Sequence, residues 1–189
     1  MMKKIVLFAS GGGSNAENII KYFHNSDAVN VAHVFCNNSN AGVIQKARDL
    51  GVKVTVFRKD EFLTTIFDEL NAINPDLIVL AGFLLKMPFE IVNKFPNIII
   101  NIHPALLPKY GGKGMYGMNV HNAVLVNNDA ETGISIHYVN ENYDEGNIIF
   151  QKKVDVSKCI SAEEIAEQIH ILEQKHFPVI IDKILQQTL

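Results

Sequence analysis

Five strand-like runs that alternate with helix-like segments constrain the fold of this chain more than any other feature. The runs cover residues 3–9, 30–36, 52–57, 77–81 and 98–101, and most of them are apolar. Segments with helical spacing separate them, at residues 17–24, 43–50, 60–73 and 89–94. Apolar strands joined through helices are typical of a parallel sheet that helices cover on both faces. The sequence therefore predicts an α/β fold.

The second half of the chain has a different pattern. Residues 109–118 contain four glycines and no periodicity, which indicates a loop or a lid. Residues 120–126 have helical spacing. Residues 133–139 and 148–156 alternate like strands, and a polar turn at 140–146 separates them. Since no linker or internal repeat interrupts the sequence, we expect one domain, 1–189.

Local signals predict how several helices begin and end. Asp60 is a plausible N-cap for the helix over 60–73. Ser161 and Glu164 have the spacing of a capping box, which predicts the start of a C-terminal helix. Pro178 lacks a backbone N–H, so we expect it to break that helix before the helix resumes toward the C-terminus.

Composition excludes several classes of protein. The 189 residues carry a formal charge of −3, without the basic surface of a nucleic-acid binder. Cys36 and Cys159 lie far apart in the sequence, which argues against a disulfide framework or a zinc site and favours the cytoplasm. The apolar run from Ile5 to Ala9 is too short for a signal peptide, and no run approaches a membrane span.

A glycine-rich loop follows the first strand and precedes the first helix. Gly11, Gly13 and Ala16 match the dinucleotide fingerprint, but this signal alone is weak. A nicotinamide site needs an acidic residue at the end of the second strand, where this chain has Asn37-Asn38. We therefore interpret the loop as a phosphate site made by backbone amides. The alternative is a tight turn that needs a positive φ.

Asn101 and His103 are the strongest candidates for chemistry. They stand two residues apart at the end of the predicted strand, so their side chains leave it on the same side. Pro104 and Pro108 follow and stiffen the next turn. An amide and an imidazole that are held rigidly side by side can act as a catalytic pair. A histidine that caps a turn is the simpler alternative.

Asp144 is the candidate carboxylate partner of His103. It lies in the polar turn beside Tyr143 and Gly146, and we expect it to face inward and Glu145 to face outward. A carboxylate opposite the imidazole would keep it protonated or fix its tautomer. We interpret His137 as a core or supporting histidine.

The remaining candidate ligands form no recognisable set. Four other histidines have no functional groups near them in the sequence: His24, His33, His121 and His176. No two of His, Cys, Asp and Glu recur at metal-ligand spacing on one element, so we predict no metal site.

The motifs occur in an order that resembles a known family. They are the Gly13-Ser14-Asn15 loop, Leu80-Ala81-Gly82-Phe83, the segment from Asn101 to Lys109, the segment from Gly133 to His137, and Asp144-x-Gly146. Together they resemble the folate-dependent phosphoribosylglycinamide formyltransferases over essentially the whole chain. The resemblance implies a Rossmann-like three-layer sandwich with a mostly parallel sheet and an antiparallel C-terminal part. It also implies a phosphate-binding half at about 1–100 and a catalytic, folate-binding half at about 101–189.

The resemblance also implies roles for individual residues. Asn101, His103 and Asp144 match the catalytic residues. The ribonucleotide-binding residues match Gly12, Gly13, Ser14, Asn15, His170 and Glu173. The folate-binding residues match Leu84, Leu85, Lys86, Met87, Asn101, Asn140, Glu141, Asn142, Tyr143 and Asp144. The bond between Leu107 and Pro108 matches one that is cis in relatives.

The implied reaction is formyl transfer from 10-formyltetrahydrofolate to the amine of 5′-phosphoribosylglycinamide, in the biosynthesis of the purine nucleotide IMP. Asn101 and protonated His103 would donate to the oxygen of a tetrahedral intermediate, and Asp144 would keep His103 charged and help to move the proton. The implied partners are these two small molecules, with no nucleic acid or membrane, and the chain would be a monomer or a homodimer.

The chain departs from the family pattern at two places. Many relatives have an arginine where this chain has Leu85, and its nearest cation is Lys86. The loop from Gly111 to Tyr116 also differs from the Pro-Gly-Leu-His of many relatives. These departures leave open the residue that contacts the folate and the role of the loop as a lid.

Two alternative functions remain. A formyltetrahydrofolate hydrolase of the same superfamily would use water as the acceptor. A non-catalytic or NAD-dependent nucleotide-binding protein could be built on the same sheet, although Asn37-Asn38 argues against the dinucleotide.

Overall fold

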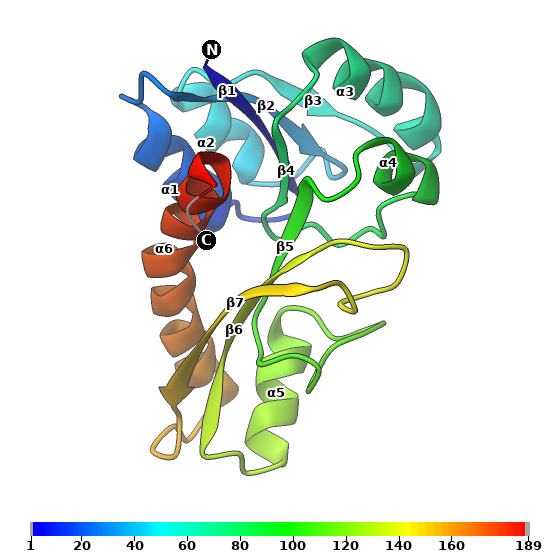
Figure 1. The fold of residues 1–189 in the computed structure, drawn as a ribbon. Coiled ribbons are helices and arrows are strands. Elements are labelled where there is room, and N and C mark those ends of the chain that lie inside the picture. The colour runs from blue at the N-terminus through cyan, green and yellow to red at the C-terminus, as the bar shows by residue number, and fades with distance from the viewer. Residues whose placement is uncertain (1, 188–189) are drawn as a thin grey trace.

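The structure is a computed structural model that describes residues 2–187, and its centre is one seven-stranded sheet (Figure 1). The strands are β1 (Lys3–Ala9), β2 (Val29–Cys36), β3 (Val54–Val56), β4 (Leu77–Leu80), β5 (Ile99–His103), β6 (Glu131–Tyr138) and β7 (Ile148–Asp155). The helices are α1 (Ser14–Phe23), α2 (Val43–Asp49), α3 (Phe67–Ile73), α4 (Phe89–Lys94), α5 (Met118–Val126) and α6 (Ala162–Gln186). A 3₁₀ turn, η1 (Lys59–Glu61), and a π-helical turn, η2 (Phe62–Ile66), precede α3.

The strand order is β3-β2-β1-β4-β5-β6-β7. The first five strands in this order are parallel, whereas β6 pairs antiparallel with β5, and β7 pairs antiparallel with β6. This confirms the predicted fold, a mostly parallel sheet with an antiparallel C-terminal part. The order reverses between β1 and β4, and open α/β sheets bind ligands beyond the carboxyl ends of the strands at such a switch point.

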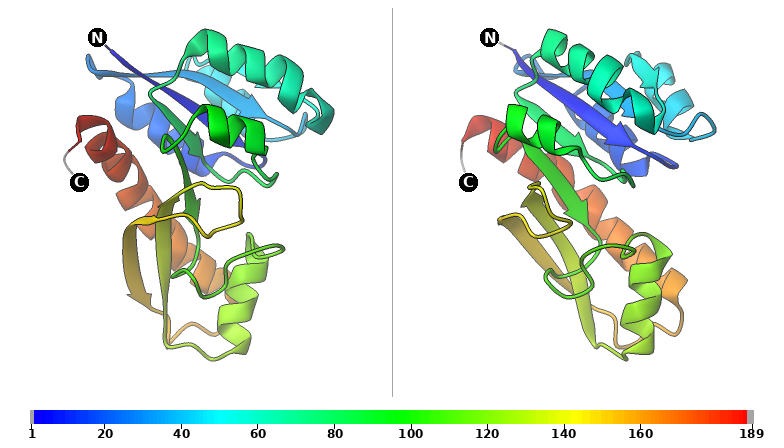
Figure 2. Two further views of the ribbon diagram at one scale, coloured as in Figure 1. Left: turned by 45° about the vertical axis from the view of Figure 1, so that its right-hand side comes forward. Right: turned by 90° about the vertical axis from the view of Figure 1, so that its right-hand side faces the viewer.

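Helices cover both faces of the sheet and complete three layers (Figure 2). On one face, Leu7 of β1 belongs to a core cluster with Ile19 of α1 and Phe177 of α6. On the other face, Phe8 packs in a second cluster with Ile91 of α4. Adjacent residues of a strand point to opposite faces, so a run that is apolar throughout serves both cores.

The start of the third helical segment differs from the prediction. Asp60 is not an N-cap, because it lies inside η1 and its carboxylate pairs with the Arg58 guanidinium at 2.7 Å. Glu61 performs the reciprocal part of the cap, since its carboxylate accepts from the Arg58 backbone N–H. The prediction failed because a nearby cation competes for the side chain of Asp60.

The prediction that Pro178 breaks the C-terminal helix was wrong. α6 runs without interruption from Ala162 to Gln186, and Pro178 is buried within it. A proline leaves the carbonyl four residues earlier without its helical donor, and that carbonyl belongs to Gln174. Asn18 of α1 donates to this oxygen at 2.8 Å. The neighbouring helix therefore satisfies the group that proline leaves unpaired.

The turn after β5 is held by the two antiparallel strands. The Leu107–Pro108 bond is cis, as the resemblance implied. The Leu107 backbone N–H donates to Ser135 Oγ at 2.9 Å, and Gln151 Nε2 donates to the Leu107 carbonyl oxygen at 3.0 Å. β6 and β7 thus fix the segment that follows His103.

Candidate active site

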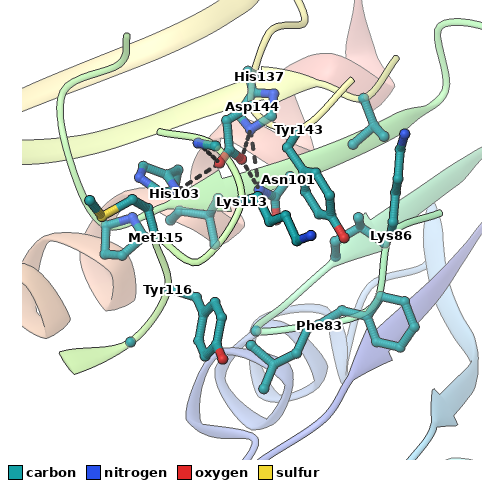
Figure 3. Close-up of a pocket in the computed structure, with 18 of the residues that line it drawn as sticks. Phe83, Lys86, Asn101, His103, Lys113, Met115, Tyr116, His137, Tyr143 and Asp144 are labelled. Atoms are coloured by element: carbon teal, nitrogen blue, oxygen red, sulfur yellow. Dashed lines mark hydrogen bonds and ion pairs between the residues drawn. The ribbon is translucent and has the colours of Figure 1, made fainter. Parts of the chain in front are cut away.

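A cavity of about 690 Å³ lies beyond the carboxyl ends of β4 and β5, next to the switch point of the sheet (Figure 3). The segment after β4, the end of β5, the loop 112–117 and the β6–β7 loop form its walls, and α6 closes one side. Its size lies in the range of cavities that bind drug-sized ligands. We call this cavity the pocket.

Four polar side chains meet at one end of the pocket: Asn101, His103, His137 and Asp144 (Figure 3). The antiparallel register of β5 and β6 places Asn101 opposite His137 and His103 opposite Ser135. Asp144 reaches the same place from the β6–β7 loop. Its Oδ2 lies 3.6 Å from His103 Nδ1, and its Oδ1 lies 3.5 Å from His137 Nε2. The structure thus brings together the three predicted catalytic residues and adds His137.

The orientation of the Asn101 amide follows from its neighbours. Its Nδ2 lies 3.2 Å from His137 Nε2 and 3.5 Å from Asp144 Oδ1. His137 Nδ1 lies 2.8 Å from the Tyr138 carbonyl oxygen, which can only accept. Nδ1 of His137 therefore carries a hydrogen, and in the neutral ring Nε2 accepts from Asn101. The contact with Asp144 is long, so this amide hydrogen is free to turn to a ligand.

His103 is almost fully buried, with 3% of its surface exposed. Nε2 lies 2.7 Å from the Tyr110 carbonyl oxygen and must donate to it, so the pocket and Asp144 face Nδ1. Burial lowers the pKa of His103, and neither Asp144 nor the Tyr110 carbonyl, which both raise it, fully offsets that effect. Asp144 thus acts in the predicted direction, toward a protonated His103, and burial acts against it.

Asp144 faces inward, as predicted, and Glu145 is exposed. The Gly112 backbone N–H donates to Asp144 Oδ2 at 2.9 Å. Burial acts to raise the pKa of Asp144, but the contacts with His137, His103 and Gly112 outweigh burial and lower it, which favours the carboxylate. Asp144 has a φ of 56°, a left-handed conformation that non-glycine residues adopt mainly where the surroundings impose it.

Glu173 and Asn15 form a polar pair at another wall of the pocket. Asn15 Nδ2 donates to Glu173 Oε2 at 2.9 Å, and Gln174 Nε2 donates to Asn15 Oδ1 at 3.0 Å. Burial raises the pKa of Glu173 to about 6. His170 lines the pocket one turn earlier on α6 and is exposed. One of the two amide hydrogens of Asn15 is thus taken up by Glu173, and the other is available to a ligand in the pocket.

The other predicted phosphate ligands lie at the amino end of α1. Gly12, Gly13 and Ser14 are not part of the pocket wall, although Asn15 is. Gly13 has a φ of 74°, and a Cβ there would lie 2.5 Å from Val43 Cβ, so packing against α2 also requires this glycine. A Cβ on Gly12 would meet no atom within 4 Å. The amides of this turn remain the candidates for an anion.

Nearly all residues predicted to bind folate line the pocket. They are Leu84, Leu85, Lys86, Met87, Asn101, Asn140, Asn142, Tyr143 and Asp144, whereas Glu141 does not. Lys86 lies over the Tyr143 ring, with Nζ 5.6 Å from the ring centre (Figure 3). The Leu84 backbone N–H donates to Ser10 Oγ at 2.9 Å, which ties this wall to the end of β1.

The sequence interpretation missed two groups of pocket residues. His121 of α5 is buried and lines the pocket, and its Nδ1 has no hydrogen-bond partner within the described chain. Burial lowers its pKa, and so would a positive charge on the nearby His103. The second group belongs to the loop 112–117, which forms one wall and includes Lys113, Met115 and Tyr116 (Figure 3). No local signal identifies His121, because packing of α5 against α6 sets its position, whereas the glycines did mark the loop.

No helix in residues 2–187 is both long and apolar enough to cross a membrane. Over the same residues, no cluster of three or more His, Cys, Asp or Glu side chains has an arrangement that could hold a metal ion.

The fold, the switch-point pocket and the cluster of titratable side chains around His103 are typical of an enzyme. The formyl transferase profile matches residues 3–181, and the chain belongs to the formyl transferase family. The family implies a formyl donor derived from folate. This confirms the family that the motifs predicted.

Its relatives point to one particular member of that family. The chain is 37% identical to the chloroplastic phosphoribosylglycinamide formyltransferase of Arabidopsis thaliana, over 99% of this chain and 67% of the relative. It is 34% identical to the phosphoribosylglycinamide formyltransferase of Bacillus subtilis, over 97% of this chain and 95% of the relative. The crystal structure of that enzyme from Anaplasma phagocytophilum is similar, with a TM-score of 0.90, 30% identity, and coverage of 99% of this chain and 89% of the other.

Proposed function

We propose that this formyl transferase moves the formyl group of 10-formyltetrahydrofolate to the amine of 5′-phosphoribosylglycinamide, a step of purine biosynthesis. The observation that carries the proposal is the meeting of Asn101, His103 and Asp144 at one end of the pocket. Its support is the family and the names of the relatives, which cover the length of this chain.

The pocket fits a folate donor in size and chemistry. Phe83, Leu85 and Met87 give it apolar surface beside the β6–β7 loop, where Tyr143 adds an aromatic ring. We assign the donor to residues 84–87 and 140–144, with Lys86 as the nearest cation in place of the arginine of many relatives. When bound, the donor supplies a formyl carbon that is open to attack by an amine.

Asn101 and His103 would stabilise the negative charge that develops on the formyl oxygen. Asn101 directs one amide hydrogen to the long contact with Asp144, and Nδ1 of His103 faces the same space. Negative charge beside Nδ1 raises the pKa of His103, so this nitrogen takes up a proton from solvent and then donates to the oxygen. The Asn101 amide is already a donor before the reaction, and donors fixed in advance toward such a charge are usually the largest catalytic contribution.

Asp144 would move the proton that the attacking amine loses. Its carboxylate is ionised at neutral pH and lies next to the ring nitrogens of both His103 and His137. It can therefore accept a proton from the amine and return it toward the leaving nitrogen of the folate, directly or through water. No covalent enzyme intermediate is required.

The ribonucleotide would bind between α1 and α6. Glu173 and His170 face the pocket from α6, and the free amides at the start of α1 favour a phosphate. A phosphate held there would position the amine for attack.

The test measures consumption of 10-formyltetrahydrofolate with and without phosphoribosylglycinamide. We expect consumption only when the ribonucleotide is present, with one formylated product for each donor used. Equal consumption without the ribonucleotide would identify a formyltetrahydrofolate hydrolase and refute the proposal. Stabilisation by NAD and not by a folate analogue would instead favour a dinucleotide-binding protein.

A further inference from the structure

A hydrogen-bonded cluster outside the pocket ends on His103. It consists of Lys109, Tyr110, Asn127 and Asp129, which we call the anchor cluster. The Tyr110 hydroxyl donates to Asp129 Oδ2 at 2.6 Å and accepts from Asn127 Nδ2 at 2.7 Å. Lys109 Nζ lies 2.7 and 2.6 Å from the two Asp129 oxygens. The phenol of Tyr110 is thus held by residues at the far end of α5.

Tyr110 connects this cluster to the active site through its backbone. Its carbonyl oxygen lies 2.7 Å from His103 Nε2. Its φ is 58°, a conformation that a residue with a bulky side chain adopts only when its surroundings require it. The hydrogen bonds of the phenol hold Tyr110 in this conformation. They fix the position of the side chain relative to the backbone, and hence the direction of the carbonyl.

The carbonyl decides which nitrogen of His103 faces the reacting groups. A carbonyl oxygen accepts and never donates, so Nε2 keeps its hydrogen in both the neutral and the charged ring. Only Nδ1 can then gain and lose a proton, and Nδ1 is the nitrogen that faces Asp144 at 3.6 Å. Without the carbonyl, the neutral ring could carry its hydrogen on either nitrogen.

We propose that the anchor cluster is a positioning device that fixes the tautomer of His103, by holding the Tyr110 carbonyl against Nε2. Tyr110 and Asp129 are therefore positioning residues and touch no substrate. This inference rests on the proposed function for its catalytic consequence, whereas its structural part, the tautomer, does not.

The charged groups around His103 give the expected direction of a pH effect. Asp144 faces it from the β6–β7 loop, His137 from β6 and His121 from α5. Among the groups that act on His103, Asp144 and the Tyr110 carbonyl raise its pKa, and His137 lowers it. Loss of the carbonyl contact would lower the pKa of His103 further. The alkaline limb of turnover, where His103 can no longer be protonated, would then move to lower pH.

The main test is Tyr110→Phe, which removes the hydroxyl and keeps the ring and the backbone. We expect kcat to fall about tenfold, a fraction of the roughly 10²–10³ expected for a lost oxyanion donor. The KM for phosphoribosylglycinamide should stay unchanged, and the alkaline limb of kcat should move to lower pH. In ¹⁵N-histidine NMR spectra of the substrate-free protein, His103 should lose its uniform Nε2–H tautomer.

Two substitutions of Asp129 separate positioning from general stability. Asp129→Asn keeps an oxygen that accepts from the Tyr110 hydroxyl, and it loses only the ion pair with Lys109, whose side chain is 60% exposed. Asp129→Asn should therefore retain near-normal kcat and the Nε2–H tautomer. Asp129→Leu should behave like Tyr110→Phe. Glu131→Gln, which removes another exposed ion pair at Lys153, is the matched control and should change neither quantity.

The outcomes are separable. An unchanged His103 tautomer in both Tyr110→Phe and Asp129→Leu would overturn the anchor. So would a loss of activity in Asp129→Asn as large as that in Asp129→Leu. The proposed function fails on a different measurement, the ribonucleotide-dependent turnover of the unaltered chain, and the tautomer is observed without any substrate.

Discussion

The two ring nitrogens of His103 have different partners. One nitrogen holds the ring in place, and the other is available for proton transfer. Nε2 is bound to a fixed carbonyl, and Nδ1 shares the pocket with a carboxylate. Burial lowers the pKa of His103 and so favours the neutral ring, whereas Asp144 and the Tyr110 carbonyl raise that pKa. In the proposed reaction, negative charge that develops beside Nδ1 would favour protonation of the ring.

Asp144→Asn should lower kcat by about 10²–10⁴, the range for a group that transfers protons. It should also lower the pKa of His103 further, since the negative charge that raises that pKa is gone. The KM for the ribonucleotide should change little. Steady-state kinetics with both substrates measures this. Glu145→Gln, at the exposed neighbour, serves as the control. If Asp144→Asn turned over within roughly threefold of this control, the proposed role of Asp144 would be contradicted.

Glu173 stabilises the fold at low pH, where its carboxyl group is protonated, and destabilises it at neutral pH, where the group is ionised. Its pKa rises from 4.5 to about 6 in the fold, so its stabilising contribution is complete below pH 4.5 and is lost as the pH rises through about 6. At 1.36 kcal/mol per pKa unit, the ionised form costs about 2 kcal/mol. A buried carboxylate kept at this cost is consistent with a role in binding.

Glu173→Gln should therefore raise the melting temperature by about 4–8 °C at pH 7.5 and leave it nearly unchanged at pH 4.5. The same substitution should raise the KM for phosphoribosylglycinamide. Calorimetry at both pH values, combined with kinetics, measures the two effects. Glu167→Gln, at an exposed site of the same helix, is the control. An equal gain in stability at both pH values would show that burial of charge is not its cause.

At the scale of elements, α1 and α6 depend on each other. Asn18 of α1 donates to the Gln174 carbonyl, which Pro178 has left without a helical donor. Asn15 of α1 is bound by Glu173 and Gln174 of α6. These contacts join the predicted phosphate turn to the wall proposed to face the ribonucleotide, so a shift of either helix changes both.

Asn18→Ala should destabilise the fold by about 1–3 kcal/mol, because it leaves a part-buried carbonyl without a donor. In the background of Pro178→Ala, which restores a backbone N–H to the helix, the same substitution should cost much less. Urea denaturation of the two single variants and the double variant measures this coupling. Additive effects of the two substitutions would show that Asn18 does not compensate for the proline.

The pairing of β5 with β6 builds the end of the pocket that holds the candidate catalytic residues. Its antiparallel register sets His137 opposite Asn101, and the hairpin loop that follows β6 returns Asp144 to the same place. Gly146 allows this return, since a Cβ there would overlap the Tyr138 carbonyl oxygen. One register shift in this pair would turn the histidine to the other face of the sheet.

The whole molecule is organised around a core that the last helix completes. Ile165, Ile169 and Phe177 of α6 pack in the same cluster as Ile19 of α1 and Leu7 of β1. The N-terminal half, which is predicted to bind phosphate, is therefore covered in part by apolar side chains of the last helix. We infer that residues 1–189 act as one domain. Its two halves differ in function, but neither folds independently of the other.

A fragment of residues 1–100 should accordingly fail to fold. Without α6, the apolar face of α1 and the sheet beneath it stay exposed to water, and that surface favours aggregation or a loosely packed state. Far-UV circular dichroism, dye binding and urea titration of the fragment test this against the full chain. A cooperative unfolding transition in the isolated fragment would contradict the single domain.

Sequence patterns predicted well what depends on neighbours along the chain. The strand runs, the glycine loop and the pairing of Asn101 with His103 on one side of a strand follow from local periodicity. They failed at Asp60, whose carboxylate pairs with Arg58 two residues earlier, and at Pro178, where Asn18 from a distant part of the sequence supplies the missing donor.

The sequence by itself determined the layered fold, the family and the identity of the groups available for chemistry, because periodicity and motif order are properties of the chain. Only the tertiary structure decided how those groups act. It placed His137 and His121 beside His103, turned the Asn15 amide to α6, and bound Nε2 of His103 to Tyr110. Contacts between segments far apart in the sequence set burial and hydrogen bonding, and these in turn set tautomers and pKa values.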